Sequence, residues 1–301
     1  MKAVVFYYSQ SGQALSVAKS ICSQLPHVVY KEIVPQQHYP FPWNKYEFFD
    51  SFPEARLGMP PSGIQPIDFS DIEDVDLVLI VGQSWFLSPS LPLQSFFADD
   101  DVRNFLKGKK MVFVNACRNM WLMTGRKVKE EVSKMHAHLV GHIVMQDSAP
   151  NLVSALSIVR WLMYGIKQPK WLLPVAGVSD AEVASASRFG DMILDACEKN
   201  NFGQLQENLL RAGAIKYKPS VLFLEKAGHR MFGLWAKFVR KKGEFRDPRR
   251  RARVTLVFYY LIVVLFVVSP FAQLFFYLTW PLQRVRHHQR RLQPLTEYSI
   301  N

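Results

Sequence analysis

Cysteine is scarce in this chain, and its few cysteines are isolated from one another: Cys22, Cys117 and Cys197. Three cysteines without a C-x-x-C spacing exclude a disulfide framework and indicate a reducing compartment. Carboxylates are also missing around the nearest candidates for metal ligands, His136, His138 and His142. Because a metal site needs a complete set of ligands, we expect no metal site here.

Several common catalytic motifs are absent as well. The chain contains neither a G-x-S-x-G sequence nor a P-loop, so a hydrolase or a nucleoside triphosphatase has no support. It has no internal repeat and no low-complexity segment. Six apolar residues follow Lys2 before Ser9, which is too few for a signal peptide. We therefore expect the large domain to stay in the cytoplasm.

Acidic residues are nearly absent from the last third of the chain. Residues 211–301 contain 18 lysines and arginines against 4 acidic residues, whereas residues 1–210 contain 19 against 21. A basic tail is typical of proteins that bind nucleic acid or an anionic membrane surface. The 30 residues 254–283 carry no charge, and this run exceeds the roughly 20 apolar residues that cross a bilayer. We therefore expect a membrane-embedded segment whose partner is an anionic membrane surface and not nucleic acid.

Pro270 divides this apolar run into two pieces, neither of which alone crosses the roughly 30 Å hydrocarbon layer. Arginines flank both ends of the run, including Arg253 before it and Arg284 after it. Since positive residues favour the cytoplasmic side, two arrangements stay open: a single kinked span and a re-entrant hairpin centred on Pro270. Residues 284–301 are a basic tail, and we expect the chain at the cytoplasmic face of the cell membrane.

Residues 206–253 are a second candidate membrane element. Apolar side chains recur there at helical spacing on one face, and cations form a stripe beside them. The apolar set is Leu224, Ala227, Met231, Leu234, Trp235 and Phe238, and the basic set is Lys226, Arg230, Lys237 and Lys241. This pattern predicts an amphipathic helix lying in the headgroup plane of a membrane. The alternative is a helix packed on the domain with a solvated basic face.

The first 205 residues alternate between apolar strands and helical patterns. The expected strands are residues 2–8, 28–34, 76–81, 110–115 and 139–145. Helical patterns lie at residues 14–21, 93–106, 121–136 and 179–200. This alternation predicts an α/β fold with a doubly wound, five-stranded parallel sheet. In such sheets ligands bind outside the carboxyl ends of the strands.

The loop after the first strand is rich in hydroxyls, amides and glycine and leads directly into a helix. Such a unit aims backbone N–H groups and the positive helix end at one point, which suits a phosphate, although an ordinary turn is the alternative. With these residues the chain resembles the flavodoxin-like family, whose first loop holds the phosphate of FMN. The resemblance implies a phosphate site made of Ser9, Gln10, Ser11, Gly12, Gln13 and Ala14. Flavodoxins typically have a threonine where this chain has Ala14, so one hydroxyl is missing.

The same resemblance implies two loops that line the flavin ring. After the third strand the implied residues are Ser84, Trp85 and Phe86, and an aromatic ring among them would stack on the flavin. The alternative is that one of these rings packs on the following helix. After the fourth strand the implied residues are Asn115, Cys117, Arg118 and Asn119, whose donors would stabilise an anionic reduced flavin or a substrate enolate. The alternative for Asn119 is a helix N-cap.

Two segments are additional to a minimal flavodoxin-like domain. Residues 35–66 are rich in proline and aromatic residues, and we expect them to form one wall of a substrate pocket. Residues 152–164 form an unusually apolar helical pattern with one charge. This helix either covers the edge of the sheet, or it contacts a lipid-like substrate or the bilayer.

The first loop, the length and the apolar tail together resemble the flavodoxin-like proteins of dialkylresorcinol and aryl polyene biosynthesis. This resemblance implies a membrane-associated FMN-dependent oxidoreductase that aromatises a cyclohexanedione-type polyketide intermediate, with a ketosynthase as a candidate partner. Two alternatives stay open: an NAD(P)H:quinone or FMN reductase at the membrane, and a non-enzymatic membrane adaptor. Membership of a fold does not choose among them.

Overall fold

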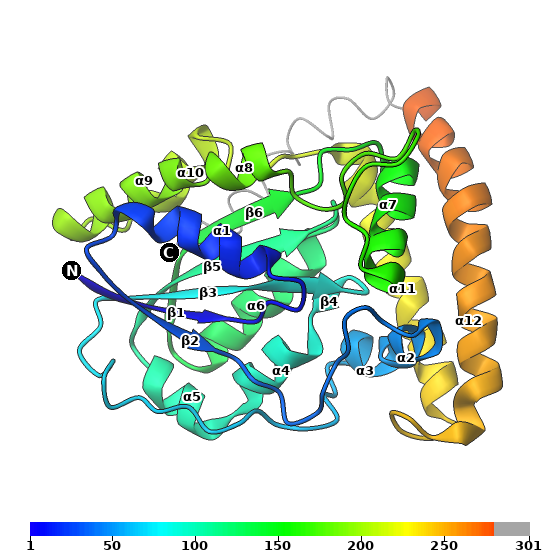
Figure 1. Ribbon diagram of the computed structural model, residues 1–301, viewed down its shortest axis with the longest axis horizontal. Coiled ribbons are helices and arrows are strands. Elements are labelled where there is room, and N and C mark those ends of the chain that lie inside the picture. The colour runs from blue at the N-terminus through cyan, green and yellow to red at the C-terminus, as the bar shows by residue number, and fades with distance from the viewer. Residues whose placement is uncertain (280–301) are drawn as a thin grey trace.

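A parallel sheet in the order β2-β1-β3-β5-β6 forms the centre of the computed structural model, which describes residues 1–279 (Figure 1). Its strands are β1 (Lys2–Tyr7), β2 (His27–Glu32), β3 (Leu77–Trp85), β5 (Lys110–Cys117) and β6 (His138–Gln146). The short β4 (Ser88–Pro89) pairs antiparallel with the end of β3. With β4 left aside, this is the flavodoxin-like order of a doubly wound sheet, which confirms the predicted fold class.

Helices cover both faces of the sheet (Figure 1). One layer contains α1 (Gln13–Ile21), the 3₁₀ turn Cys22–Gln24, α8 (Asp180–Ala184), α9 (Ser187–Glu198) and α10 (Leu205–Arg211). The other contains α4 (Leu91–Ala98), α5 (Asp100–Leu106) and α6 (Leu122–Lys134). Along β1, Ala3 and Val5 face the first layer while Val4 and Phe6 face the second, and all four are fully buried. A strand buried on both faces accounts for its continuous apolar sequence.

The close approach of α1 and α9 depends on Gly190. A Cβ atom at this position would lie 1.9 Å from the carbonyl oxygen of Ile21, which is far shorter than any van der Waals contact between non-bonded atoms. Glycine therefore lets α9 lie directly on the backbone of α1, and α1 is the helix that begins at the candidate phosphate loop.

Two of the expected helices are each divided in the structure. Residues 93–106 form α4 and α5, because Asp99 takes an extended conformation and its Oδ1 accepts a 3.0 Å hydrogen bond from Val102 N. Residues 179–200 form α8 and α9, and Ser179 caps the first of them by accepting from Glu182 N at 3.2 Å. At Asp99 a short polar side chain that caps a new helix ends the preceding apolar periodicity. The break between α8 and α9 lies at Ser185 and Ala186 and has no side-chain cap.

The two additional segments lie beyond the carboxyl ends of β1 and β3, together with the C-terminal helices (Figure 1). Residues 35–66 contain α2 (Lys45–Asp50) and α3 (Phe52–Leu57), and the second segment contains α7 (Asn151–Tyr164). The two segments contact each other, since Trp43 N donates a 2.7 Å hydrogen bond to Leu162 O. They enclose the edge of the sheet at which this class of fold binds ligands.

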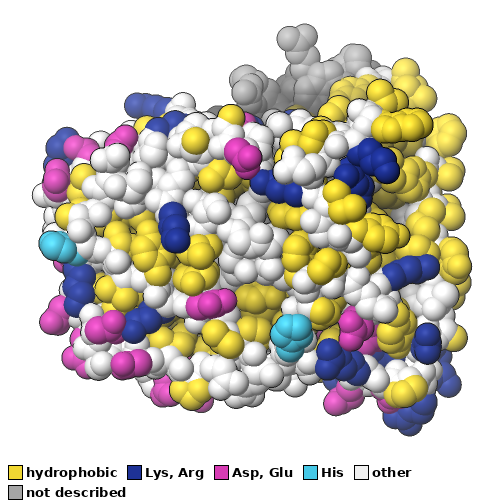
Figure 2. All heavy atoms as spheres, viewed as in Figure 1, with side chains coloured by type: hydrophobic (Ala, Val, Ile, Leu, Met, Phe, Trp, Pro, Cys, Tyr) yellow, Lys and Arg dark blue, Asp and Glu magenta, His cyan; other side chains and the backbone are white. Residues whose placement is uncertain are grey.

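One helix among the described residues is long and apolar enough to cross a membrane by its length and composition alone. It runs from Pro248 to Thr279; its most apolar 18-residue window has a mean hydropathy of 2.4, and 17% of that window is buried. It consists of the 3₁₀ turn Pro248–Arg250, α12 (Arg251–Val263), the π-helical segment Val264–Val268 and a final helical stretch through residue 279. Figure 2 shows hydrophobic side chains gathered along it.

This helix passes through Pro270 without a turn, so the described residues do not form a hairpin centred there. Proline removes one backbone donor and crowds the carbonyl one turn before it, and the π-helical segment Val264–Val268 lies at that place. Residues 280–283 of the expected membrane segment and the basic tail 284–301 lie outside the described residues. Insertion of the helix into a membrane stays a prediction.

The amphipathic segment contains α11 (Pro219–Arg240), which packs on the domain with one face and leaves apolar side chains on another. The buried apolar side chains are Val221, Leu222, Ala236 and Val239, and those with more than a third of their surface exposed are Phe223, Met231, Leu234 and Phe238. The helix therefore combines packing on the domain with an exposed apolar face. Its contact with a membrane stays a prediction.

Candidate functional site

The loop between β1 and α1 has the geometry of an anion cradle. Gly12 is in the left-handed region at φ +82° and occupies the N-cap position of α1, and no side chain caps the helix. No acidic residue lies in the first turn, and no acceptor among residues 1–279 is found for the backbone N–H groups of residues 11–14. A Cβ atom on Gly12 would have nothing within 4 Å. These N–H groups lie at the positive end of a helix, beside the open Cβ position of Gly12.

Side chains of the predicted phosphate loop hold its shape. Ser9 Oγ accepts a 3.1 Å hydrogen bond from Leu15 N. Gln10 Nε2 donates to Pro40 O at 2.9 Å, and the Gln13 amide exchanges two hydrogen bonds with the backbone of Val178, at 2.8 and 3.1 Å. Both glutamine side chains therefore tie the loop to distant segments.

Two further members of the predicted loop, Ser11 and Ala14, have different surroundings. Ser11 is half-buried beside Gly12, and Ala14 is fully buried under the loop, where it packs in the core beneath α1. Of the polar side chains in the predicted phosphate loop, Ser11 alone makes no hydrogen bond to other described residues. The loop offers mainly backbone N–H groups, and Ala14 contributes no hydroxyl.

Trp85 ends β3 and Phe86 follows it, so Ser84 and Trp85, expected in a loop, lie in the strand, and the two aromatic residues lie inside the protein rather than on an open surface. Trp85 is 7% exposed, and its ring centroid lies 6.0 Å from that of Tyr8, 5.3 Å from Tyr39 and 5.5 Å from Trp43. Phe86 packs with its centroid 4.8 Å from that of Phe48. Tyr39, Trp43 and Phe48 all belong to the additional segment 35–66, so this segment packs against both candidate stacking residues. Stacking of either ring on a flavin stays a prediction.

The hairpin that carries these aromatic residues is strained. Phe86 and Leu87 have φ values of 49° and 63°, and both lie between the paired strands β3 and β4. A left-handed conformation is unfavourable for bulky side chains and costs of order 1–2 kcal/mol per residue. Packing of Phe86 against Phe48 and Phe52 offsets this cost. Strain of this kind is found disproportionately at functional loops.

Polar side chains at the ends of β3 and β5 form a connected chain. Ser84 Oγ lies 3.0 Å from Asn115 Oδ1 and 2.8 Å from Thr124 Oγ1. Asn115 is fully buried, and its Nδ2 donor has no acceptor among the described residues. Because an unpaired buried amide is unfavourable, this donor is a candidate for contact with a ligand.

Arg118 and Asn119 connect the loop after β5 to the beginning of α7. Both side chains donate to Asn151 Oδ1 at 2.8 Å, and Arg118 also donates to Asn151 O at 2.8 Å. Asn119 does not cap α6, since the N-cap position is Trp121 and has no side-chain cap. The buried Asn119 Oδ1 has no donor among the described residues. This orphan acceptor and the orphan donor of Asn115 lie at the carboxyl end of the same strand.

Desolvation changes the ionisation of the groups near this loop. It raises the pKa of the Cys117 thiol well above its ordinary value, and the negative charge of Glu225 raises it further. It also lowers the pKa of Arg118, while the charge of Asp147 opposes that change. The thiol therefore stays protonated and is not prepared for nucleophilic attack.

Glu225 is a buried acid at this place that the sequence analysis did not select. It belongs to α11, has no exposed surface, and its Oε1 accepts a 2.8 Å hydrogen bond from Met123 N at the start of α6. Burial raises its pKa to about 7, and its Oε2 has no partner among the described residues. One signal was present in the sequence, because Glu225 is the single acidic residue within residues 219–240.

A second buried charge cluster connects the start of α12 to the additional segment. Arg250 is fully buried, with its Nε 2.6 Å from Asp50 Oδ1 and its guanidinium 2.7 and 2.9 Å from the two Glu54 oxygens. Arg250 also donates to Asp50 O. Arg250 is one of the arginines that flank the apolar run in the sequence, and in the structure it pairs inside the domain. It joins α12 firmly to α2 and α3.

The three histidines do not gather around a shared centre. His142 is buried within β6 and stacks on Phe113 at 5.2 Å between centroids, and burial lowers its pKa to about 3. His136 lies in the turn before β6, and His138 begins that strand. Within residues 1–279 no group of three potential metal ligands is found.

Comparisons with known proteins give no family for the chain. No protein-family model and no curated protein matches it. Solved structures that resemble it include a flavodoxin from the domain Archaea, at 14% identity and a TM-score of 0.37, covering 66% of this chain and 99% of that one. Another is a flavoprotein in complex with FMN from Lactobacillus acidophilus NCFM, at 21% identity and 0.40, covering 48% and 92%.

An azoreductase from Bacillus anthracis str. Sterne is also similar, at 12% identity and a TM-score of 0.34, covering 64% of this chain and 99% of that one. Their descriptions name a flavodoxin, a flavoprotein in complex with FMN and an azoreductase. At these identities the likeness concerns the fold alone. The strand order of the sheet itself defines the class of protein: a flavodoxin-like α/β domain followed by a long apolar helix.

Proposed function

We propose that the chain binds FMN, with its phosphate at the loop between β1 and α1. The observation that carries this proposal is the set of N–H groups at residues 11–14 that lack partners among the described residues, next to the open Cβ position of Gly12. They lie at the carboxyl end of β1 in a sheet of flavodoxin-like order. The donor set suits a phosphate because it combines the helix dipole, the Ser11 hydroxyl and the absence of acidic residues in the first turn.

Residues at the carboxyl ends of β3 and β5, where the flavin ring would lie, partly fit a polar aromatic ligand. Asn115 Nδ2 and Asn119 Oδ1 are buried and lack partners among the described residues, so they would bind the polar edge of a flavin. Trp85 and Phe86 are less accessible, because the additional segment packs on both. We therefore propose that Asn115 and Asn119 hold the ring and that the aromatic residues shape the wall behind it.

FMN, when bound, supplies transfer of a hydride or of single electrons. The chain's own contribution is to orient the partners, to exclude water and to hold a proton. Glu225 fits the last role, because its raised pKa lets the carboxyl group gain or lose a proton near neutral pH. Its charge acts on the Cys117 thiol, which places it near the carboxyl end of β5.

We further propose that the protein is an oxidoreductase that works on lipid-like molecules at the cytoplasmic face of a membrane. The long apolar helix that ends the described chain and the exposed apolar side chains of α11 support this location. The specific reaction that we propose is aromatisation of a cyclohexanedione-type polyketide intermediate of dialkylresorcinol or aryl polyene biosynthesis. This reaction removes a hydride and a proton from the ring, and a ketosynthase would supply the substrate.

The test begins with full-length protein purified in a mild neutral detergent. Its visible absorbance is recorded, FMN is titrated in, and turnover is measured with a cyclohexanedione and, separately, with NAD(P)H and a quinone. Bound flavin with cyclohexanedione turnover supports the proposal, and bound flavin with quinone turnover alone supports the reductase alternative. A protein that binds no FMN contradicts the proposal and leaves the membrane adaptor.

A further inference from the structure

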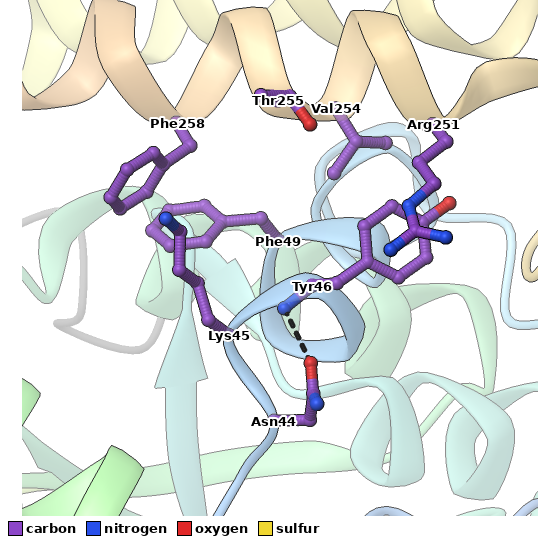
Figure 3. A pocket seen from close by; sticks show the side chains of 8 residues that line it. All are labelled: Asn44, Lys45, Tyr46, Phe49, Arg251, Val254, Thr255 and Phe258. Carbon is purple, nitrogen blue, oxygen red and sulfur yellow. Dashed lines mark hydrogen bonds between the residues drawn. The ribbon is translucent and has the colours of Figure 1, made fainter.

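A cavity lies between α2 and the beginning of α12, away from the candidate flavin site. Its volume is about 260 Å³. Its wall combines cationic, aromatic and hydroxyl side chains, and Figure 3 shows how they face it from the two helices. The lining residues are Asn44, Lys45, Tyr46, Phe49, Arg251, Val254, Thr255 and Phe258.

Two cations at this cavity lack acidic partners. Lys45 Nζ lies 3.8 Å from the ring centroid of Phe258, and the Arg251 guanidinium lies 5.2 Å from that of Tyr46. Neither cation makes an ion pair with an acidic residue within residues 1–279. Two cations that are held over aromatic rings and lack acidic partners indicate affinity for an anion.

Two neighbouring arginines are paired with carboxylates, whereas Arg253 lies 4.2 Å from the ring centroid of Phe238 and donates to Phe238 O. Arg249 pairs with Asp247 at 2.6 Å, and Arg250 pairs with Asp50 and Glu54 inside the domain. The buried pairing also fixes the start of α12 against α2, so the walls of the cavity are held in place. Lys45 and Arg251 therefore face a preformed space with their charges available.

The cavity lies where a polar surface passes into an apolar one. Immediately beyond it along α12, Leu256, Tyr259 and Ile262 are exposed, at 50%, 57% and 39% of their surface. Cations and aromatic residues at such a boundary are typical of the headgroup level of a membrane. An amphiphile whose chains lay along α12 would place its headgroup at this cavity.

We infer that this cavity binds the anionic phosphate headgroup of a membrane lipid. Lys45 and Arg251 would contact the phosphate, the Thr255 hydroxyl would donate to it, and the side chains of Phe49 and Phe258 would cover the glycerol and upper acyl carbons. The inference rests on the proposed membrane location. It adds that the additional segment 35–66, which also packs on Trp85, is held at the membrane surface by a lipid.

The experiment uses full-length protein in a neutral detergent and isothermal titration calorimetry. The probes are dihexanoylphosphatidylglycerol, dihexanoylphosphatidylcholine and inorganic phosphate. Each cation near an anionic surface contributes about a fivefold increase in affinity, so the double variant Lys45→Gln/Arg251→Gln should bind the phosphatidylglycerol about 25-fold more weakly. The matched control is Lys19→Gln/Lys107→Gln, which removes two exposed cations on other faces and should bind like the wild type.

A second variant, Thr255→Trp, keeps every charge and fills the cavity. A headgroup site loses phosphatidylglycerol binding in this variant, whereas general electrostatic attraction does not change. Four results overturn the inference: no phosphatidylglycerol binding by the wild type, equal binding in all variants, equal affinity for the phosphatidylcholine, or equal affinity for free phosphate. Circular dichroism of each variant verifies its fold.

Failure of the membrane location is recognised separately. Flotation of the wild type with neutral phosphatidylcholine vesicles measures insertion through the apolar helix, without any anionic headgroup. If the wild type floats but does not bind the phosphatidylglycerol, the headgroup site alone is wrong. If it does not float, the proposed location is wrong, and the headgroup inference falls with it. FMN titration of the same samples is independent of both results.

Discussion

Replacing Gly12 by aspartate tests the proposed phosphate site with little disturbance of the fold. Gly12 has φ +82° and open space around its Cβ position, and aspartate tolerates the left-handed region better than most residues. The new carboxylate would stand close to a phosphate bound by the N–H groups of residues 11–14. With an effective dielectric constant near 20, two unit charges at about 4 Å repel by roughly 4 kcal/mol, and solvent around the loop reduces this.

We expect a loss of about 3 kcal/mol, which weakens FMN binding at least 100-fold. The matched control is Gly108→Asp, because Gly108 has φ +74°, an equally open Cβ position, and a place before β5 at the opposite edge of the sheet. FMN affinity is measured by quenching of flavin fluorescence. If Gly12→Asp and Gly108→Asp bind FMN equally well, the phosphate does not lie at this loop and the reasoning from its N–H groups is refuted.

Three further predictions concern stability, each measured by thermal unfolding of the full chain in detergent. Burial raises the pKa of Glu225 from about 4.5 to about 7, so the stability that its protonated form contributes is fully present below pH 4.5 and is lost as the pH rises through 7. Glu225→Gln should therefore leave the free energy of unfolding nearly unchanged at pH 5 and raise it by about 3 kcal/mol at pH 8. A difference between variant and wild type that does not change with pH would contradict this. Arg250→Leu leaves Asp50 buried without a side-chain cation and leaves Glu54 with Arg240 alone, 3.4 Å away, so it should cost about 3–5 kcal/mol. An unchanged melting temperature would disprove the importance of this cluster. Gly190→Ala should cost at least about 1–3 kcal/mol, since its Cβ overlaps a backbone oxygen, and a neutral result would mean that α9 can move away freely.

The candidate site and the long apolar helix are physically connected through the additional segment 35–66. Its Tyr39 and Trp43 pack on Trp85 at the end of β3, and its Asp50 and Glu54 hold Arg250 at the start of the apolar helix. A change in the position of the apolar helix would therefore reach the ligand-binding edge of the sheet through one packed segment. This connection would link a membrane-bound apolar helix to the ligand-binding edge of the sheet.

The sequence by itself determined the elements whose signals are local. Apolar runs such as residues 76–81 identified the buried strands, and the alternation with helices identified a doubly wound sheet. The loop around Gly12 was recognised because a glycine and short polar residues between a strand and a helix have few other uses. The uncharged run 254–283 was visible because a membrane-length apolar stretch needs no tertiary context.

Tertiary structure alone decided which side chains are available for function. Trp85 looked free to stack on a ligand, but residues 39–48, far away in the sequence, pack on its ring and on that of Phe86. Arg250 looked like one of several flanking arginines, but the fold places it between Asp50 and Glu54. Glu225 and the cavity beside Lys45 depend on contacts between segments about 100 to 200 residues apart. Burial and pairing arise from such distant contacts, and no local pattern records them.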